Sequence, residues 1–301
     1  MAIRESLGEK IFRVFNYTAL SLLGAATFYP FYYVLVQSLN DGRDALKGGL
    51  YFLPRVWTLA NYMKAFEDPI IVNAFMITLF RTIVGTVLSV LLTAMAAYAL
   101  ARKDLPGRSA ISFYFFVTTI FSGGMIPFFI VLRELHLTST IWIYILPAVY
   151  SFFNLIVMRT YFQSSIPFEL WESATIDGYN EQKIFFKIYL PLSLPMLATI
   201  TLFVGVGHWN DWFTGAYYVT DKKLRPAATI LQQILSEANF EQSTDVAGNY
   251  RQGSSLVSAA NTTPESLRMA FVMIITIPII FIYPFLQRYF VNGIMIGSIK
   301  G

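Results

Sequence analysis

Long runs of apolar residues, each about the length of a membrane-spanning helix, alternate with short polar segments along the chain. A helix needs about 20 mainly apolar residues to cross the roughly 30 Å hydrocarbon core of a bilayer. Six windows meet this requirement, and only the second holds a full charge well inside it, Arg81. We therefore predict an all-α polytopic membrane protein with six transmembrane helices, at Val14–Leu39, about Asn73–Ala101, Ser109–Leu132, Leu137–Met158, Ile188–Asn210 and Met269–Gln287.

The overall composition supports a membrane protein and excludes several other classes. Of the 301 residues, 55% are apolar and 13% are charged, which is about half the charged fraction of an ordinary soluble domain. The 22 Lys and Arg residues barely outnumber the 18 Asp and Glu residues and do not cluster, so nothing indicates a nucleic-acid partner. The chain has no cysteine, which excludes disulfides, thiolate metal sites and cysteine nucleophiles.

The distribution of basic residues predicts the orientation of the chain. Lys and Arg are denser in the terminal segments and in the loops 102–108 and 159–187 than in the other connections, which favours cytoplasmic termini. The segment 159–190 is then a cytoplasmic loop and 211–268 an extracytoplasmic loop. The alternative, that the first window is a cleaved signal peptide, is disfavoured because the window is too long and ends in aromatic residues instead of a small-residue cleavage site.

The predicted spans contain almost no ionisable groups, and this limits the possible mechanisms. Arg81 is expected to snorkel to the interface as an anchor, with a role in a translocation pathway as the alternative. His208, near the end of the fifth window, is expected to be a satisfied interfacial residue rather than a proton relay. This scarcity weighs against an ion-driven carrier and against an intramembrane hydrolase. No phosphate-binding loop motif is present, so any ATP hydrolysis must occur in another subunit.

Proline and glycine residues inside the windows predict local breaks. Pro30, Pro127, Pro147 and Pro278 can each kink a span because proline lacks an N–H group. Gly123-Gly124 followed by Pro127 is the strongest candidate for a break, in the third window. Such a break can line a pathway or merely allow close helix packing.

The loop between the fourth and fifth windows predicts a helix, a turn and a second helix. Pro167 suits the first turn of a short helix with Glu169 near its positive dipole end, and Gly178 suits its end in a left-handed conformation. A second short helix, Glu181–Tyr189, then leads to Pro191. A plain solvated connection with ordinary caps remains the alternative reading.

The ordered residues of this loop resemble the EAA loop of permease subunits of binding-protein-dependent ABC importers. The loop reads Glu172-Ser173-Ala174, then Asp177-Gly178, then Ile188-Tyr189-Leu190-Pro191, with serine in place of the first alanine of that motif. Further segments are similar to the carbohydrate-uptake branch, which includes the second maltose-transporter permease and polysaccharide or oligosaccharide permeases. They are Asn61-Tyr62, Ala96 to Arg102, Pro106-Gly107-Arg108, Trp209 to Phe213 and Gln287 to Gly301.

The resemblance implies a type I ABC importer permease fold over residues 1–301, in a bacterial-type cytoplasmic membrane. The implied partners are a second permease subunit, two ATP-binding subunits, an extracytoplasmic solute-binding protein, membrane lipid and a carbohydrate substrate. The chain itself would be no enzyme and would hold no cofactor or metal, because the partner ATPase binds ATP and Mg. The implied ATPase-coupling residues are Glu172, Ser173, Ala174, Asp177, Gly178, Leu190 and Pro191.

The outer loop and the C-terminal tail are weaker functional candidates. In related permeases the outer loop contacts the binding protein, with a simple connection as the alternative. Aromatic faces suit sugars, although Trp209 and Trp212 are also typical membrane-interface anchors. The tail, with Gly293, Gly297 and Gly301, either reaches the ATPase or is flexible. The predicted substrate-path or binding-protein contacts are Trp209, Asn210, Tyr217, Tyr218 and Tyr250.

Two other functional classes remain as rivals. A membrane enzyme acting on lipid-linked glycans needs reactive polar groups clustered at an interface, and Glu172 with Asp177 is the nearest candidate pair. An ion-coupled carrier needs charged groups within its spans. Dependence on ATP rather than on an ion gradient, and lack of turnover of a lipid-linked substrate, distinguish the transport subunit from both.

Overall fold

The computed structural model describes residues 6–243 and 262–297, and within these ranges the chain is helical. The only bridge between extended residues there joins Asn40 and Trp57. This confirms the predicted all-α class. The chain forms two compact units: the first comprises residues up to Asp68 and Ile234–Thr276, and the second comprises Pro69–Gln233 and the residues from Ile277 onward.

The first unit begins with a long helix, α1, whose start is capped as the sequence dictates. The Ser6 side chain accepts a hydrogen bond from the Glu9 N–H, and the Glu9 carboxylate accepts one from the Ser6 N–H, so two otherwise unpaired donors are satisfied. The helices of this unit are α1 (Leu7–Ser38), α2 (Gly42–Ala45), α3 (Ala60–Glu67) and parts of α13 (Ala227–Ser243) and α14 (Pro264–Gly297).

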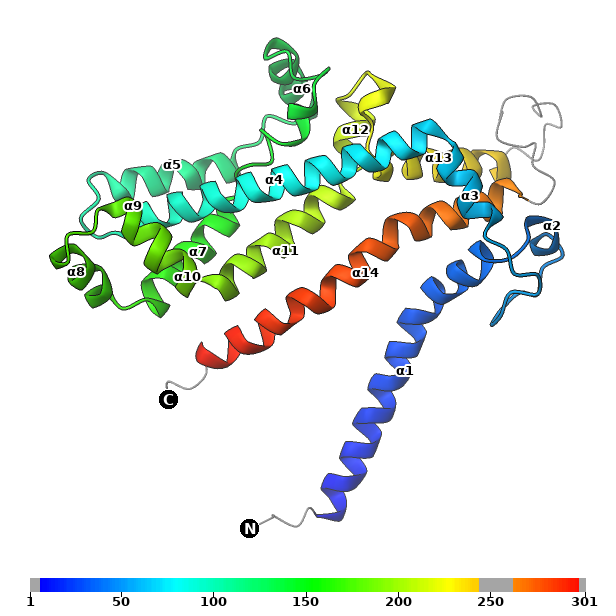
Figure 1. Cartoon of the computed structure of the whole chain (residues 1–301), viewed down its shortest axis with the longest axis horizontal. Coiled ribbons are helices and arrows are strands. Elements are labelled where there is room, and N and C mark those ends of the chain that lie inside the picture. Colours follow the sequence, from blue (N-terminus) through cyan, green and yellow to red (C-terminus); the bar gives the residue numbers. More distant parts are fainter. Residues whose placement is uncertain (1–5, 244–261, 298–301) are drawn as a thin grey trace. The chain divides into compact units, whose positions relative to one another are not determined.

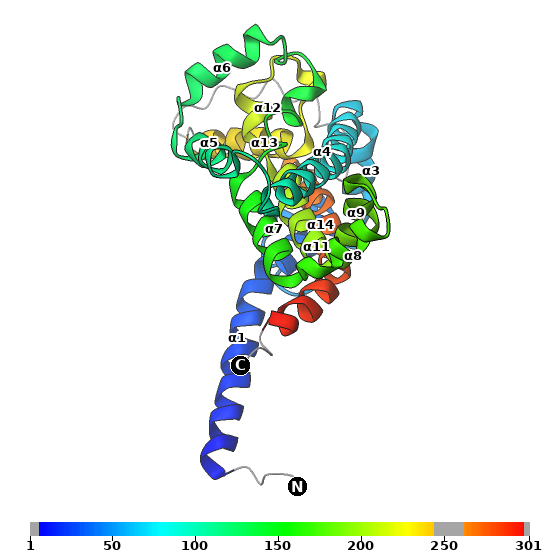
Figure 2. The same ribbon diagram turned by 90° about the vertical axis from the view of Figure 1, so that its left-hand side faces the viewer.

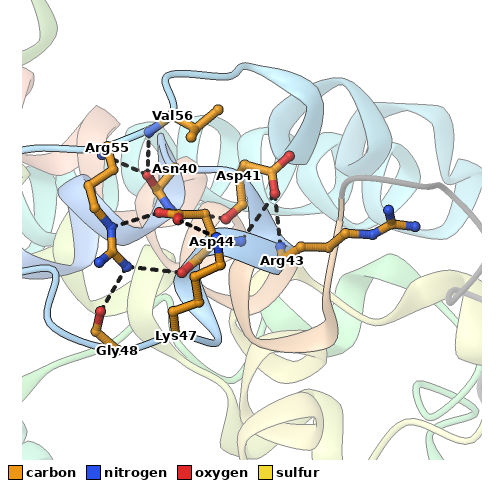
Figure 3. A network of polar contacts seen from close by, with 8 residues as sticks. All are labelled: Asn40, Asp41, Arg43, Asp44, Lys47, Gly48, Arg55 and Val56. Carbon is orange, nitrogen blue, oxygen red and sulfur yellow. Dashed lines mark hydrogen bonds and ion pairs between the residues drawn. The ribbon is translucent and has the colours of Figure 1, made fainter.

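A polar network stabilises the turn that follows α1 (Figure 3). The Arg55 Nε donates to Asp44 Oδ2 over 2.8 Å, and the Arg55 Nη2 donates to the Asp44 and Gly48 carbonyl groups. Asn40 is fully buried, donates to Asp44, and accepts hydrogen bonds from the Arg55 and Val56 N–H groups. Because Asp44 lies at only 9% exposure, these donors are what make its buried charge tolerable.

Asn61 ties three segments of the first unit together. Its amide donates to the Ser38 and Asn40 carbonyls, each over 2.9 Å, and its amide oxygen accepts from the Ser266 hydroxyl over 2.9 Å. Asn61 therefore links the end of α1, the helix α3 and the start of α14. Tyr62 adds a 2.6 Å hydrogen bond between its hydroxyl and that of Ser38.

The second unit is built around α4, which packs along α7 and α11 (Figures 1 and 2). Close approach is possible because Gly85 of α4 offers no side chain where His208 of α11 lies; a Cβ there would come within 2.6 Å of the ring. The elements are α4 (Pro69–Ala101), α5 (Arg108–Ile120), α6 (Met125–Glu134), η1 (Ile141–Tyr144), α7 (Phe152–Ser165), α8 (Phe168–Ile176), α9 (Glu181–Ile184), η2 (Phe185–Tyr189), α10 (Leu190–Leu192), α11 (Leu194–Asn210), α12 (Phe213–Tyr217) and η3 (Lys222–Leu224).

Three helices of the described chain are long and apolar enough to cross a membrane, and five spans result if each of two bent helix pairs is one span. The three are α1, α4 and the stretch Pro264–Ile282 of α14. They coincide with the first, second and sixth predicted windows. The third and fifth windows correspond to the bent pairs.

The third window is broken where its glycines predict a break. Helices α5 and α6 meet at 115°, and Gly124 between them has a φ of +84°. The left-handed conformation explains the glycine, since side chains disfavour it. The structure thereby confirms the predicted break before Pro127.

The fourth window differs from a single spanning helix. Its first part is the short 3-10 helix η1 followed by turns, and its second part enters α7, which has 14 residues. Such a helix is about 21 Å long, short of the roughly 30 Å core. Pro147 explains the interruption, because it cannot donate a hydrogen bond and its ring clashes with the carbonyl one turn earlier.

Two other predicted kink sites lie inside continuous helices. Pro30 lies inside α1 and Pro278 inside α14. Most of the C-terminal segment that was considered as a tail is helical, because α14 continues through Gly293 to Gly297. Gly301 lies outside the described residues.

Candidate functional site

The loop after α7 folds into the predicted helix, turn and helix (Figure 1). Pro167 directly precedes α8, with a φ of −58° that suits a helix start, and Glu169 lies in the first turn near the positive end of the helix dipole. Asn180 caps the next helix, since its side chain accepts from the Lys183 N–H over 3.0 Å. Local sequence signals therefore suffice to form this element.

Gly178 ends α8 in a defined capping motif. Its φ is +79°, its N–H donates to the Thr175 carbonyl, and the Tyr179 N–H donates to the Ala174 carbonyl over 2.9 Å. These two hydrogen bonds are those of a Schellman motif, which needs a left-handed residue after the helix. A Cβ on Gly178 would contact nothing, so only the backbone conformation demands glycine here.

The second helix of the loop contains a single π-turn just before Pro191. The Leu190 N–H donates to the Phe185 carbonyl five residues earlier, instead of four. Pro191 cannot donate, and a proline ring is incompatible with a regular α-helical carbonyl one turn before it. The wider turn accommodates this proline, and π-turns of this kind are common at functional sites.

The predicted coupling residues divide into an outward-facing group and a group that packs inward. Glu172, Ser173, Asp177, Gly178 and Pro191 are exposed, whereas Ala174 is buried and Leu190 is half-buried. Beside the two carboxylates, Ile176 at the end of α8 is 86% exposed. The exposed end of α8 therefore combines one apolar side chain, Ile176, with two carboxylates, Glu172 and Asp177.

The inward face of α8 rests on Arg102, the residue that follows α4. The Arg102 guanidinium carbon lies 3.5 Å from the centroid of the Trp171 ring, and Phe168 stacks on Trp171 with ring centroids 5.3 Å apart. Arg102 also forms a bidentate ion pair with Asp104, over 2.9 and 2.7 Å. Hydrogen bonds from Arg102 lower the pKa of the Asp104 carboxyl below its ordinary value.

Glu181 completes this anchor from the second helix of the loop. Its carboxylate accepts hydrogen bonds from the Trp171 indole N–H, at 3.3 Å, and from the Tyr98 hydroxyl, and lies 3.5 Å from the Arg102 guanidinium. Both helices of the loop are therefore joined to the end of α4. We did not predict Tyr98, Arg102, Trp171 or Glu181 as site residues, although Tyr98 and Arg102 lie within the motif Ala96 to Arg102.

An aromatic core lies directly under this anchor. The Tyr98 ring packs edge-on against Tyr189 at 4.7 Å and Phe162 at 6.5 Å, and lies 5.4 Å from Phe185. All four rings are buried. Close packing of this kind resists deformation, so the end of α4 is held firmly against α7 and the second helix of the loop.

At the other end of α11, the predicted substrate-path residues occupy different environments. Asn210 is exposed and Tyr217 is 55% exposed, with its ring 4.6 Å from that of Phe213. Trp209 is buried edge-on against Phe75, and Tyr218 is buried between Phe128 and Phe213. Tyr250 lies outside the described residues.

A family model matches residues 89–296, more than half of the chain, and it describes the inner membrane component of binding-protein-dependent transport systems. The chain belongs to this family. Membership also places it in a membrane, in agreement with its long apolar helices.

Individual relatives of this permease cover nearly the whole chain. It is 36% identical over 295 residues to a polygalacturonan/rhamnogalacturonan transport system permease of Bacillus subtilis, which covers 97% of this chain and 99% of that protein. It is 30% identical over 281 residues to an arabinooligosaccharides transport system permease of Halalkalibacterium halodurans, with 91% of each chain covered.

Among solved structures, the permease is similar to a chain of a bacterial ABC transporter involved in the import of the acidic polysaccharide alginate. The TM-score is 0.83 at 28% identity, over 96% of this chain and all of that one. The fold therefore resembles that of a type I ABC importer permease.

Arg81 and His208 of the permease behave differently from the sequence-based expectation. Arg81 does not snorkel: it is fully buried, its guanidinium donates to Asp211 Oδ2 over 3.3 Å and to the Asp211 carbonyl, and it lies 4.9 Å from the Tyr144 ring centroid. His208 is 6% exposed, and its Nε2 has no hydrogen-bond partner, so it is not a satisfied interfacial residue. The partner of Arg81 is 130 residues away in the sequence, which explains why the helix pattern alone misplaced it.

Proposed function

We propose that this permease is one half of the translocation pathway of an ATP-driven importer for a carbohydrate, an oligosaccharide or a fragment of a polysaccharide. The cargo class is supported by the relatives named for polygalacturonan, arabinooligosaccharides and alginate. The observation that carries the ATP-driven part is the helix α8, which exposes Glu172, Ser173 and Asp177 while its other face is fixed to the end of α4.

In this proposal α8 docks into a cleft of an ATP-binding partner and transmits its closure mechanically. A partner can shift the permease between inward- and outward-open states only if it contacts α8 differently in the two. Glu172 and Asp177 supply carboxylates for basic groups of the partner, and Ile176 supplies an apolar contact. Arg102 and Glu181 pass the displacement to α4.

The proposal includes the full membrane topology. The six spans are α1, α4, the α5–α6 pair, the segment from η1 through α7, the segment from η2 through α11, and α14. Both termini and the coupling loop 159–190 are cytoplasmic, and 211–268 is extracytoplasmic. The excess of Lys and Arg in the segments assigned to the cytoplasm supports this orientation.

The proposal also names the partners. They are a second permease subunit, two ATP-binding subunits that carry ATP and Mg, an extracytoplasmic solute-binding protein and the surrounding lipid. The permease itself does no chemistry and holds no cofactor. Asn210 and Tyr217, together with Tyr250, are proposed contacts for the sugar or the binding protein, because two of them are exposed beside the end of α11.

Reconstitution tests the function directly. The permease, its partner permease, the ATP-binding subunit and the binding protein are incorporated into proteoliposomes and supplied with tritium-labelled oligogalacturonides, arabinooligosaccharides or alginate oligosaccharides. Uptake of at least one sugar that requires internal ATP and survives an ionophore supports the proposal. Absence of uptake of all three with ATP, or uptake driven by an ion gradient without ATP, contradicts it.

A further inference from the structure

The second unit has an open cavity of about 340 Å³ that none of the coupling residues lines. It lies between α6, η1 and the turns after it, α7 and the end of α11 with the start of α12. Its volume is at the lower end of the range of small-molecule sites. The residues the argument uses are Phe128, Tyr144, Asn154, His208 and Asp211.

Two nearly buried side chains in the wall have unused hydrogen-bonding capacity. Asn154 of α7 is 7% exposed. Its main-chain N–H donates a hydrogen bond to the Ser151 hydroxyl, which caps the start of α7. Its amide has two donors and one acceptor that no described residue engages. His208 of α11 also lines the cavity, but its unpartnered Nε2 lies against Gly85 of α4 and not in the cavity. Buried polar groups are normally paired, so the Asn154 amide indicates a polar occupant.

The charge in the wall is already neutralised, which narrows the chemistry of that occupant. Asp211 pairs with Arg81 through Oδ2 and accepts the Thr214 N–H through Oδ1. Arg81 in turn is fully buried under Tyr144. Arg81 and Asp211 are therefore engaged with each other, whereas the free amide of Asn154 matches the hydroxyl groups of a sugar ring, which both donate and accept.

The remaining wall is aromatic and apolar. The rings of Phe128 and Tyr144 line the cavity, and the Tyr144 hydroxyl is fixed by a 2.8 Å hydrogen bond to the Leu224 carbonyl. Aromatic faces beside a few polar groups suit a sugar ring, which has an apolar face and a rim of hydroxyls.

We propose that this cavity is a subsite for one ring of the translocated sugar, with Asn154 bonding its hydroxyls and Phe128 and Tyr144 packing on its face. The inference rests on the proposed function and deepens it, because it places a sugar contact inside this permease and not only in its partner. It assigns specificity to residues that the sequence motifs do not mark.

The test uses the complete transporter in proteoliposomes and whichever of the three labelled oligosaccharides the wild type imports. Asn154→Leu keeps the side-chain volume and removes the hydrogen bonds. We expect the sugar imported per ATP hydrolysed to fall about fivefold, the loss typical of one hydrogen bond, while ATP hydrolysis stays near wild type. Thr201→Val, on α11 but outside the cavity wall, is the matched control and should change neither quantity.

The outcomes separate the subsite from a structural role and from failure of the function itself. If Asn154→Leu lowers uptake and ATP hydrolysis in proportion, or changes neither, the sugar imported per ATP hydrolysed stays constant. Either result contradicts the proposed subsite. Failure of the wild type to import any sugar rejects the proposed function instead.

A second measurement covers the case in which Asn154→Leu does not assemble. Benzoylphenylalanine replaces Phe128 in the cavity, or Phe113, which is 65% exposed, as the control, and the working transporter is illuminated with the labelled sugar. Label on the permease at position 128 well above position 113 supports the subsite. Equal label at the two positions overturns it.

Discussion

Arg102 lies with its guanidinium carbon 3.5 Å from the centroid of the Trp171 ring. The contact joins the residue after α4 to the middle of α8, two elements separated by about 70 residues in sequence. A guanidinium stacked on an indole is attracted by the negative face of the ring, and both groups are flat, so the contact fixes orientation as well as distance. It holds α8 in a defined position relative to the end of α4.

Arg102→Gln should uncouple the loop from α4 without preventing membrane insertion. The lost stacking and ion pairs contribute about 1–2 kcal/mol at a partly exposed site. We expect the stimulation of ATP hydrolysis by sugar-loaded binding protein to fall severalfold in proteoliposomes. Arg102→Lys keeps the charge but loses the flat stacking surface, so its stimulation should lie between those of the wild type and Arg102→Gln. Full stimulation in Arg102→Gln would contradict the role of this contact.

Gly178→Ala should damage the turn after α8 through the backbone alone. At a φ of +79° a side chain costs about 1–2 kcal/mol, and no neighbouring atom adds a clash. We expect lower transport-coupled ATP hydrolysis with normal membrane insertion. Gly178→Asn, which tolerates this conformation better, should retain more activity. Gly24→Ala, in open space within α1, is the control for the added methyl group. Wild-type coupling in Gly178→Ala would show that the turn geometry is not needed.

The loop could be predicted almost completely from sequence because its signals are local. A proline before the helix, an acidic first turn and a glycine after it each act within a few residues, and so does the glycine pair that breaks the third window. Contacts between distant segments left no such signal. Arg102 and Trp171, or Arg81 and Asp211, pair only after the helices pack, and Arg81 therefore seemed to be a lone charge needing an interface.

The interruption within the fourth window could not be predicted for a related reason. Hydropathy records which residues are apolar but does not record where the helix is interrupted. Pro147 divides the fourth window into η1 with its turns and α7, and the same apolar residues then line a cavity instead of one continuous helix.

Asn61→Leu should destabilise the first unit. The substitution leaves the buried Ser38 and Asn40 carbonyls without their donor and removes the acceptor of Ser266, at about 1–3 kcal/mol for a buried unsatisfied group. We expect a Tm in detergent several degrees below wild type, measured by thermal unfolding followed by size-exclusion chromatography. Met63→Leu, on the same helix and 61% exposed, should leave the Tm unchanged. An unaltered Tm for Asn61→Leu would show that the hydrogen bonds contribute nothing net.

Asp44 should make the first unit sensitive to acid. The hydrogen bond from Asn40, with further hydrogen bonds from Arg55 and Lys47, lowers the pKa of Asp44 below its ordinary value despite the opposing effect of burial. Since the pKa is lower in the folded state, the stabilisation is present above the unfolded pKa of about 3.9 and is lost as the pH falls through the folded value.

Comparison with Asp44→Asn isolates this effect from the other carboxylates. The wild type should have the higher Tm at pH 6, and the difference between the two proteins should narrow below about pH 4. A difference that is constant from pH 6 to pH 3 would mean that the charge of Asp44 does not stabilise the fold.

Cross-linking from the tip of α8 tests the docking of this loop on an ATPase most directly. The chain has no cysteine, so Ile176→Cys introduces a single attachment point, at a side chain that is 86% exposed, for a benzophenone maleimide. Leu53→Cys, at a residue that is 66% exposed in a segment predicted to be extracytoplasmic, is the control. We predict that illumination of the assembled transporter joins position 176, but not position 53, to the ATP-binding subunit, with a yield that changes when ATP is added. An active transporter that forms no adduct at position 176, or forms it equally at position 53, would contradict docking through α8.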